Sequence, residues 1–326
     1  MQNDTFIMYD HEGIDIFVYR WMPDGDVPLR GIVQIAHGMC ETALRYKGLA
    51  EQLTAHGYGV YANDHIGHGR TAKDANALGN PGPDAFNRMA HNMIELGQVA
   101  AKEHPGQELF LLGHSMGSFL TQKVMYARHE SYKGFILSGT NGKRSLVRLG
   151  EQLALMQGKL QGTNHRSMLL NAIVFGGFNR SFRPVRTAFD WLSRDSAEVD
   201  SFINDPLCGA ICTTDFFQSF FHLLQEIHLP ENTSRIDRTK PVYIFGGQRD
   251  PVGLFGKGIM NLVNMYTALG MKQVDYKLYP EGRHEMLHEI NRNEVYHDIL
   301  HWLEHHGSAQ YALPARVDDN ETGISM

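Results

Sequence analysis

The chain has 326 residues, of which 42% are hydrophobic and 20% are charged, and its formal net charge is −6. This ordinary globular composition excludes a disordered chain, a collagen-like repeat and a disulfide-dense mini-protein. The slight acidic excess disfavours nucleic acid as the main partner, because phosphate binding requires a concentrated basic face. The length suits one large domain or a domain that carries a sizeable insertion.

The cysteines and the N-terminal segment indicate the compartment. Cys40, Cys208 and Cys212 form no CxxC pair and are odd in number, which argues against a disulfide framework and is typical of a reducing cytosol. The N-terminal segment carries acids where a signal peptide needs a basic start. The longest mostly apolar stretch, residues 168–178, is shorter than the ~20 residues of a membrane-spanning helix. We therefore expect a cytoplasmic protein without a transmembrane segment.

Strand-like and helix-like segments alternate over the first part of the chain. Short apolar or alternating runs predict strands at 14–20, 31–36, 57–62, 108–113 and 133–138. Amphipathic spacing predicts helices between them, at 46–56, 86–104 and 118–129. Buried strands separated by such helices predict an α/β fold with a mostly parallel sheet covered on both faces.

The alternation stops at about residue 140 and returns after residue 238. Between these positions helical spacing recurs without a convincing strand, at 146–160, 167–175, 186–192, 197–203 and 214–228. Strands are again predicted at 241–245 and 274–279, and helices at 257–269 and 285–306. We therefore predict an α/β core formed by residues 1–139 and 239–306, a helical insertion at 140–238, and a flexible C-terminal tail at 307–326.

A G-x-S-x-G pattern lies between a predicted strand and a predicted helix. Residues 113–117 read Gly-His-Ser-Met-Gly, with Ser115 at the centre. At a tight strand-to-helix turn a serine projects its hydroxyl above the sheet, and the flanking glycines avoid clashes with neighbouring chain. The position predicts Ser115 as a catalytic nucleophile.

A serine hydroxyl is a poor nucleophile until a base removes its proton. In this arrangement an acid and then a histidine follow the serine, in loops after later strands. Asp250 and His284 each follow one of the two later predicted strands. Asp237 and Asp275 fit less well, because the first precedes its strand and the second lies inside one. We predict a catalytic triad of Ser115, Asp250 and His284.

The other histidines are less suited than His284 to act as the base. His114 flanks the nucleophile and is expected to point away from it, whereas His65 and His68 lie in an early loop that shapes the site. His284 and His288 have the i,i+4 spacing of a helical metal pair, but no third ligand is evident. No metal ion and no cofactor are therefore expected.

Acyl transfer also requires donors for a tetrahedral oxyanion, and backbone N–H groups usually supply them. The amide of Met116, directly after the nucleophile, is the first predicted donor. The second is the amide of Met39, in a loop after an early strand where Gly38 lets the backbone approach the substrate. The neighbouring Cys40 is expected to pack as a small buried side chain.

Five motifs occur in order on the two sides of the insertion: His37-Gly38-Met39-Cys40-Glu41 with Arg45-Tyr46, residues 64–69, residues 113–117, the Asp250 loop and Glu281-Gly282-Arg283-His284. Together they resemble the monoacylglycerol lipase and lysophospholipase branch of the α/β-hydrolases, of the serine aminopeptidase S33 type. The resemblance implies an α/β-hydrolase fold and the same triad and oxyanion donors. It also implies that the insertion is a helical cap over the acyl site. The family usually has a small residue or glycine where Cys40 stands.

The insertion offers two apolar surfaces. Phe216, Phe217, Phe220 and Phe221 share one face of the predicted helix 214–228. Such a stripe forms core more often than a ligand pocket, and an acyl-chain tunnel that binds the substrate is the alternative. A second apolar surface could make a weak contact with a membrane surface; it comprises Met156, Met168, Leu169, Leu170, Ile173, Val174 and Phe175.

These observations predict a serine carboxylic-ester hydrolase that acts through an acyl-enzyme on monoacylglycerol-like, lysophospholipid-like or other medium-chain esters. One alternative is that the same triad cleaves a lactone, amide, thioester or carbon–carbon bond of a bulky small molecule. Another is a ligand-binding receptor or pseudoenzyme on the same scaffold. The complete set of Ser115, Asp250 and His284 speaks against the last alternative.

Overall fold

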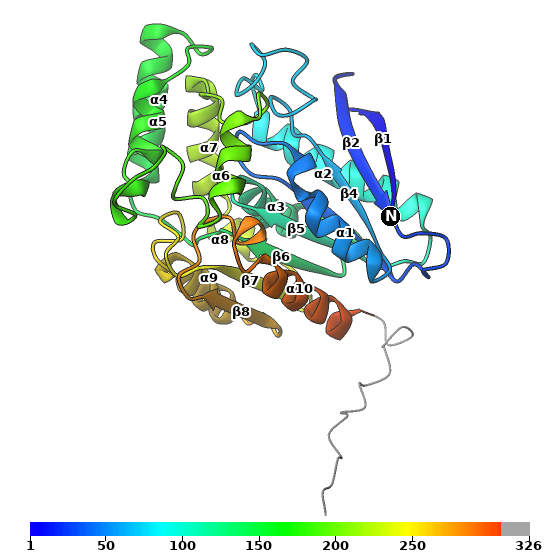
Figure 1. Ribbon diagram of the computed structural model, residues 1–326. Coiled ribbons are helices and arrows are strands. Elements are labelled where there is room, and N and C mark those ends of the chain that lie inside the picture. The colour runs from blue at the N-terminus through cyan, green and yellow to red at the C-terminus, as the bar shows by residue number, and fades with distance from the viewer. Residues whose placement is uncertain (308–326) are drawn as a thin grey trace, which may run out of the picture.

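A computed structural model describes residues 1–307 of the chain (Figure 1). Apart from Gly307, the predicted tail lies outside the described residues. One eight-stranded sheet forms the centre, with the order β1-β2-β4-β3-β5-β6-β7-β8. Its strands are β1 (Gln2–Tyr9), β2 (Asp15–Met22), β3 (Gly31–Ala36), β4 (Tyr58–Asn63), β5 (Leu109–His114), β6 (Gly134–Ser138), β7 (Val242–Gly247) and β8 (Val274–Tyr279). The strand β2 pairs antiparallel with β1 and β4, and all other neighbours are parallel.

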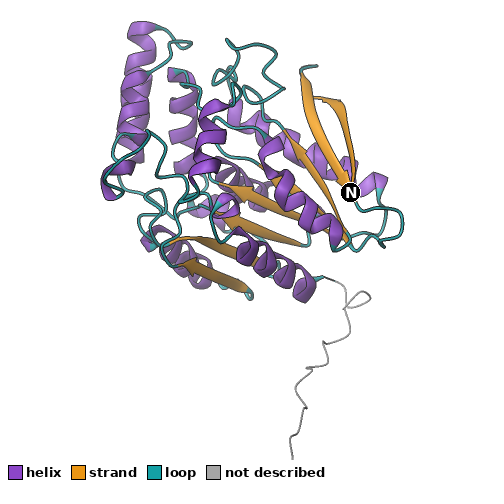
Figure 2. Ribbon diagram, in the orientation of Figure 1, coloured by secondary structure: helices purple, strands orange, loops and turns teal. Residues whose placement is uncertain are grey.

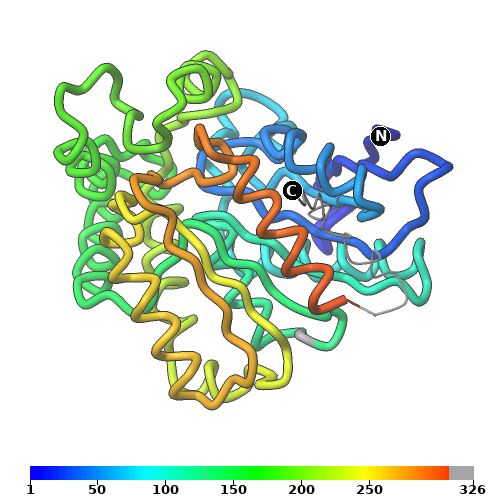
Figure 3. The backbone as a smooth tube through the Cα atoms, turned by 60° about the horizontal axis from the view of Figure 1, so that its bottom comes forward, coloured from blue at the N-terminus to red at the C-terminus, as the bar shows by residue number. Residues whose placement is uncertain are grey.

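Helices cover both faces of the sheet (Figure 2). On one face, α1 (Lys47–Ala55) and α10 (Arg292–His306) contribute to one hydrophobic cluster, and they lie side by side in Figure 3. On the other face, α2 (Ala85–Glu103), α3 (Met116–Ala127) and α9 (Lys257–Ala268) contribute to a second cluster. The central strands β3, β5, β6 and β7 are buried at every position, because both of their faces are covered. The predicted α/β class with a mostly parallel sheet is therefore confirmed.

The helical segment between β6 and β7 is called the cap segment here. It contains α4 (Val147–Gln161), α5 (Met168–Phe175), α6 (Ser196–Asn204), α7 (Thr214–Glu226) and the short α8 (Pro230–Thr233). Short 3₁₀ helices occur in the cap segment at Phe178–Ser181 and elsewhere at Ala43–Tyr46, His129–Ser131 and Met286–His288. The helix α7 joins the cap segment to the core, since it packs against α4 on one side and against α2 and α3 on the other. The predicted domain limits at 139/140 and 238/239 stay a prediction.

One strand was missed, and two predictions about elements were wrong. The strand β1 was not predicted, because most of its side chains are exposed and its sequence carries no buried alternation. Residues 186–192 form no helix; the Asp190 carboxylate accepts the N–H groups of Arg186 and Thr187 and closes local turns instead. The predicted helix 285–306 is divided, and α10 begins only at Arg292.

None of the helices within residues 1–307 is both long and apolar enough to cross a membrane.

Candidate active site

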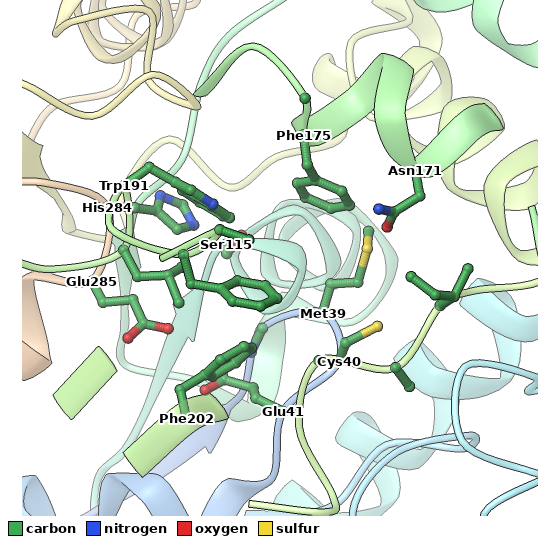
Figure 4. A pocket seen from close by; sticks show the side chains of 18 of the residues that line it. Met39, Cys40, Glu41, Ser115, Asn171, Phe175, Trp191, Phe202, His284 and Glu285 are labelled. Carbon is green, nitrogen blue, oxygen red and sulfur yellow. The ribbon is translucent and has the colours of Figure 1, made fainter. Parts of the chain in front are cut away.

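Ser115 lies in a strained turn between β5 and α3. Its backbone angles are φ 51° and ψ −117°, in a region that residues other than glycine rarely adopt. A Cβ atom at Gly113 would lie 2.3 Å from Thr121 Oγ1, and one at Gly117 would lie 2.1 Å from the Ala36 carbonyl oxygen. Both flanking positions therefore require glycine, as the G-x-S-x-G pattern predicts. The turn exposes Ser115 to a cavity above the sheet (Figure 4).

Asp250 and His284 meet at the same edge of the sheet. Asp250 follows β7 and His284 follows β8, and the His284 Nδ1 lies 3.0 Å from Asp250 Oδ2. The other Asp250 oxygen accepts the N–H of Val252 at 2.8 Å, which fixes the carboxylate. Burial lowers the pKa of His284, but the charge and hydrogen bond of Asp250 outweigh it, so this pKa is raised. An Nδ1–H donated to Asp250 leaves Nε2 as the basic nitrogen, and Figure 4 shows the imidazole beside Ser115.

The loop after β3 runs directly beside the nucleophile. A Cβ atom at Gly38 would lie 3.4 Å from Ser115 Cβ and only 2.7 Å from Glu41 Oε1. The Gly38 N–H donates to that same Glu41 oxygen at 2.5 Å, which orients the peptide leading to Met39. Met116 is the first residue of α3, and N–H groups of a first turn have no acceptor within the helix. Of the two residues predicted to supply oxyanion donors, Met39 thus lies in the loop after β3 and Met116 in the first turn of α3, directly after Ser115.

A buried charge network lies under this loop. Arg45 donates to both oxygens of Glu285, at 2.8 and 2.7 Å, and to Glu41 Oε2 at 2.5 Å. The Tyr46 hydroxyl donates to Glu41 Oε1 at 2.8 Å. Burial raises the pKa of Glu41 and of Glu285, but the Arg45 guanidinium outweighs it and lowers both. The two carboxylates are therefore ionised, and they hold residues 37–41, the predicted oxyanion loop, on a fixed support.

The cavity at Ser115 has a volume of about 320 Å³ and is walled by both the core and the cap segment. Core residues contribute the loop 38–41 with His114, Ser115, His284 and Glu285, whereas α5, α6 and the irregular segment 188–192 supply most of the apolar wall. Asp250 is fully buried and does not belong to this lining. The loop after β8 that carries His284, called the histidine loop, is hydrogen-bonded to the cap segment. The N–H groups of His284 and Glu285 donate to the carbonyls of Trp191 and Leu192 at 3.3 and 2.8 Å. The Trp191 ring lies 5.2 Å from the His284 ring. The cap segment therefore helps to hold His284 in place.

The four predicted substrate-binding phenylalanines lie elsewhere. Phe216, Phe217, Phe220 and Phe221 are buried in the core cluster that joins α7 to the sheet, with at most 8% of any of them exposed. None of them belongs to the set of described residues that line the cavity. Phe216 and Phe220 instead pack against Phe86 of α2. Their position fits the core role that the stripe indicates, and the structure does not bring them to Ser115.

The other histidines have separate places. The His114 ring lines the cavity and lies 4.9 Å from the His284 ring, so it does not point away from the site as expected. Burial, followed by the charge of His284, lowers the pKa of His114 to about 3, which keeps it neutral. His65 and His68 are buried outside the cavity wall and pack around His37. Within residues 1–307 no group of three histidine, cysteine or acidic side chains is placed to hold a metal ion.

Several cavity residues were not singled out for that role from the sequence. Asn171 and Phe175 come from α5, Trp191 from the irregular segment, Phe202 from α6 and Glu285 from the histidine loop. Figure 4 shows Asn171 on the side of the cavity opposite Glu285. Only Glu285 had a local signal, its position next to His284. The others come from separate parts of the cap segment that pack together only in the folded chain.

A serine at a strand–turn–helix elbow of a mostly parallel eight-stranded sheet, with an acid–histidine pair after later strands, defines an α/β-hydrolase. A family model described as serine aminopeptidase, S33, matches residues 27–291, and the chain belongs to this family. The chain is 27% identical over 301 residues to the monoglyceride lipase of Homo sapiens, covering 90% of this chain and 88% of that protein. It is also 27% identical over 302 residues to the monoacylglycerol lipase of Mycolicibacterium smegmatis, covering 90% and 94%.

Among solved structures, a highly thermostable carboxyl esterase from Bacillus coagulans, in complex with glycerol, superposes with a TM-score of 0.86. It is 25% identical in sequence, and the match covers 94% of this chain and 99% of that one. The similarity thus extends over the sheet and the cap segment together. The protein is a serine ester hydrolase of the monoglyceride lipase-like branch.

Proposed function

We propose that this ester hydrolase works through an acyl-enzyme on Ser115. The observation that carries the proposal is the His284–Asp250 hydrogen bond beside the strained serine. His284 Nε2 removes the Ser115 hydroxyl proton as Oγ attacks the ester carbonyl, and then gives that proton to the leaving alcohol. Water, deprotonated by the same imidazole, attacks the acyl-enzyme and releases the acid. Asp250 keeps the imidazole oriented and stabilises its charged form.

The amides of Met39 and Met116 are the proposed oxyanion donors. Gly38 lies against Ser115 and is held by Glu41, and Met116 begins the helix whose N-terminus faces the nucleophile. Each such donor contributes ~3–4 kcal/mol to stabilising the tetrahedral intermediate. This role requires no metal ion and no cofactor.

The proposed substrates are monoacylglycerol-like, lysophospholipid-like or other medium-chain esters. Phe175, Phe189 and Phe202 with Trp191 and Ile211 give the cavity mostly apolar walls that suit an acyl chain, and its volume lies near the lower limit of the ~300–1,000 Å³ typical of small-molecule sites. Asn171 and Glu285 give the cavity polar side chains on two opposite sides. Relatives named as monoacylglycerol lipases and a structural neighbour that holds glycerol support the same substrate class.

We also propose that the outer face of α4 and α5 contacts the lipid surface that holds such substrates. Of the apolar surface predicted from the sequence, Met156, Met168, Leu169 and Ile173 are exposed, whereas Leu170 is buried and Phe175 lines the cavity. Leu146, Leu149 and Leu160 are further exposed apolar side chains at or next to α4. Figure 1 places α4 and α5 at the edge of the molecule farthest from β1. The helix α5 also carries Asn171 and Phe175 of the cavity wall, so a lipid bound to this face would lie next to the site.

The test is hydrolysis of p-nitrophenyl esters from acetyl to palmitoyl, run with the wild type and Ser115→Ala. We expect a maximum at medium or long chains, no turnover by the variant, and fluorophosphonate labelling of Ser115 only in the wild type. Monoacylglycerols and lysophospholipids are then compared as substrates. Full activity in the variant would refute the mechanism. Turnover restricted to short esters would refute the lipid assignment and favour lactones, amides or thioesters.

Lipid contact is tested separately, by co-sedimentation with phosphatidylcholine vesicles. Replacing Leu160, which is 80% exposed, by glutamate should weaken vesicle binding without changing hydrolysis of a water-soluble ester. Equal sedimentation of the two proteins, or none by the wild type, would remove this part of the proposal.

A further inference from the structure

Two cysteines that are remote in the sequence meet beside the oxyanion loop. Cys40 Sγ lies 3.1 Å from Cys212 Sγ, and 172 positions separate the two residues. Cys40 belongs to the loop that passes Ser115, whereas Cys212 lies in the cap segment just before α7. The third cysteine, Cys208, packs with a different hydrophobic cluster. The thiol pair therefore spans the boundary between the core loop and the cap segment.

The backbone around both thiols is held by hydrogen bonds. The Cys40 carbonyl accepts the Gly209 N–H at 2.8 Å, and the Cys212 carbonyl accepts the Ser167 N–H at 3.1 Å. The Arg166 guanidinium donates to the neighbouring Ile211 carbonyl at 2.6 Å. A disulfide has an S–S length of about 2.05 Å, so the two sulfur atoms need to approach by only about 1 Å. Side-chain rotation can supply this movement while the backbone stays in place.

The two thiols differ in reactivity and access. Cys40 is partly exposed and lines the cavity, whereas Cys212 is 1% exposed. The Cys212 hydrogen bond, with smaller effects of His68 and Arg166, lowers the pKa of Cys40 and outweighs the desolvation of its sulfur, which raises it. Burial raises the pKa of Cys212. An oxidant that enters the cavity thus meets the more ionised thiol first.

We propose that hydrogen peroxide oxidises this pair to a Cys40–Cys212 disulfide. The Cys40 thiolate attacks one peroxide oxygen, the O–O bond breaks, and a sulfenic acid and hydroxide form. The Cys212 sulfur then attacks the Cys40 sulfur, the S–O bond breaks, and the Cys212 proton leaves with the hydroxyl as water. Two thiols are oxidised by two electrons in all, and the peroxide is reduced to two molecules of water. A thiol reductant reverses the reaction.

The disulfide would tie the oxyanion loop to the cavity wall at Gly209, Ala210 and Ile211. The wall could then not move away from the loop to admit a long acyl chain, while a short ester would still fit. This consequence for catalysis rests on the proposed function, whereas formation of the bond does not. Oxidation of the thiol pair would thus limit the length of the acyl chain that the cavity accepts.

The experiment treats the folded full chain with hydrogen peroxide, blocks remaining thiols, and maps the peptides by mass spectrometry. We expect the loss of two hydrogen atoms and a crosslinked peptide with Cys40 and Cys212, in the wild type and in the matched control Cys208→Ser. Cys212→Ser should give no crosslink. Free thiols in the treated wild type, a Cys40 sulfinic acid in place of the crosslink, or a crosslink through Cys208 would overturn the proposal.

Enzyme kinetics test the effect of the disulfide on substrate preference. The ratio of palmitoyl to acetyl ester hydrolysis should fall several-fold on oxidation and recover with dithiothreitol, in the wild type and Cys208→Ser but not in Cys212→Ser. A crosslink that leaves this ratio unchanged would overturn the effect on the cavity. Absence of esterase activity before oxidation would refute the proposed function alone, because the crosslink is read by mass.

Discussion

The guanidinium of Arg45 forms ion pairs with both Glu41 and Glu285 in the buried network. Among residues 1–307, no other arginine or lysine side chain pairs with both of these carboxylates. The Arg45 side chain is 9% exposed, and those of Glu41 and Glu285 are 2% and 5% exposed. Replacing Arg45 by methionine keeps an unbranched chain but removes three hydrogen bonds and the positive charge. Two carboxylates are then left buried without a counter-charge.

The expected cost follows from this burial. Removal of one partner from a buried ion pair destabilises proteins by ~3–5 kcal/mol, because the remaining charge cannot be solvated. For a chain of this size the loss corresponds to a fall in Tm of roughly 4–7 °C. The Gly38 peptide also loses its rigid support, since Glu41 accepts its N–H, so esterase activity should fall as well.

The cost should depend on pH in a defined direction. In the wild type the pKa values of Glu41 and Glu285 are lowered, so these groups stabilise the fold above the ordinary glutamate pKa and lose this effect as the pH falls. In Arg45→Met, burial and mutual repulsion should raise both pKa values above their unfolded values. The loss of folding stability in the variant is therefore largest at high pH. It becomes smaller at lower pH, as the two carboxylates take up protons.

The assay is urea denaturation of the wild type and Arg45→Met at about pH 8 and about pH 5.5. The difference in unfolding free energy between the two proteins should be larger at the higher pH. Lys277→Met is a matched control, since Lys277 also contacts two carboxylates, Glu294 and Asp298, but is 38% exposed. It should cost only ~0–1 kcal/mol. Arg45→Met with Glu285→Gln should recover part of the loss. A cost for Arg45→Met as small as that of the control, and independent of pH, would refute the reasoning.

Three further variants test the site and its surroundings. Asp250→Asn should lower kcat/KM about 10³–10⁴-fold with little change in Tm, because His284 loses its orienting partner; it should also move the acid limb of the pH profile to lower pH, since the Asp250 charge raises the pKa of His284. An unshifted limb would contradict this role. Gly38→Ala places a methyl group 2.7 Å from Glu41 Oε1 and should reduce p-nitrophenyl butyrate hydrolysis about 10–100-fold, so wild-type turnover would count against the oxyanion loop. Phe216→Ala should cost ~3–5 kcal/mol in urea denaturation yet leave acyl-chain preference unchanged, and a changed preference in a stable variant would restore the tunnel hypothesis.

Much of the core could be read from local patterns. The predicted strands 31–36 and 274–279 agree with β3 and β8 at both ends, and the others differ by one to two residues. Such agreement arises because buried parallel strands are short apolar runs and amphipathic helices repeat with their own period. The elbow at Ser115 was equally local, since two glycines and a serine in a strand–helix junction define the turn.

The cap segment was predicted less well for a physical reason. Its helices were largely found, but residues 186–192 form turns fixed by the Asp190 carboxylate rather than a helix. Residues of this irregular segment then pair with the histidine loop through Trp191 and Leu192. The pattern of apolar residues within one segment does not indicate which other segment it will contact. These cavity residues therefore could not be predicted from the sequence.

The sequence by itself determined the α/β class, the order of the core strands and helices other than β1, and the positions of Ser115, Asp250 and His284 in that order. These features depend on local apolar patterns and on their succession along the chain. Only the tertiary structure decided that His284 bonds Asp250, that Arg45 joins Glu41 to Glu285, and that Cys40 lies against Cys212. It also decided that α7 turns its phenylalanines to the core while α5 and α6 face the cavity. An apolar helical face can be buried against any apolar surface, and packing in three dimensions selects which one.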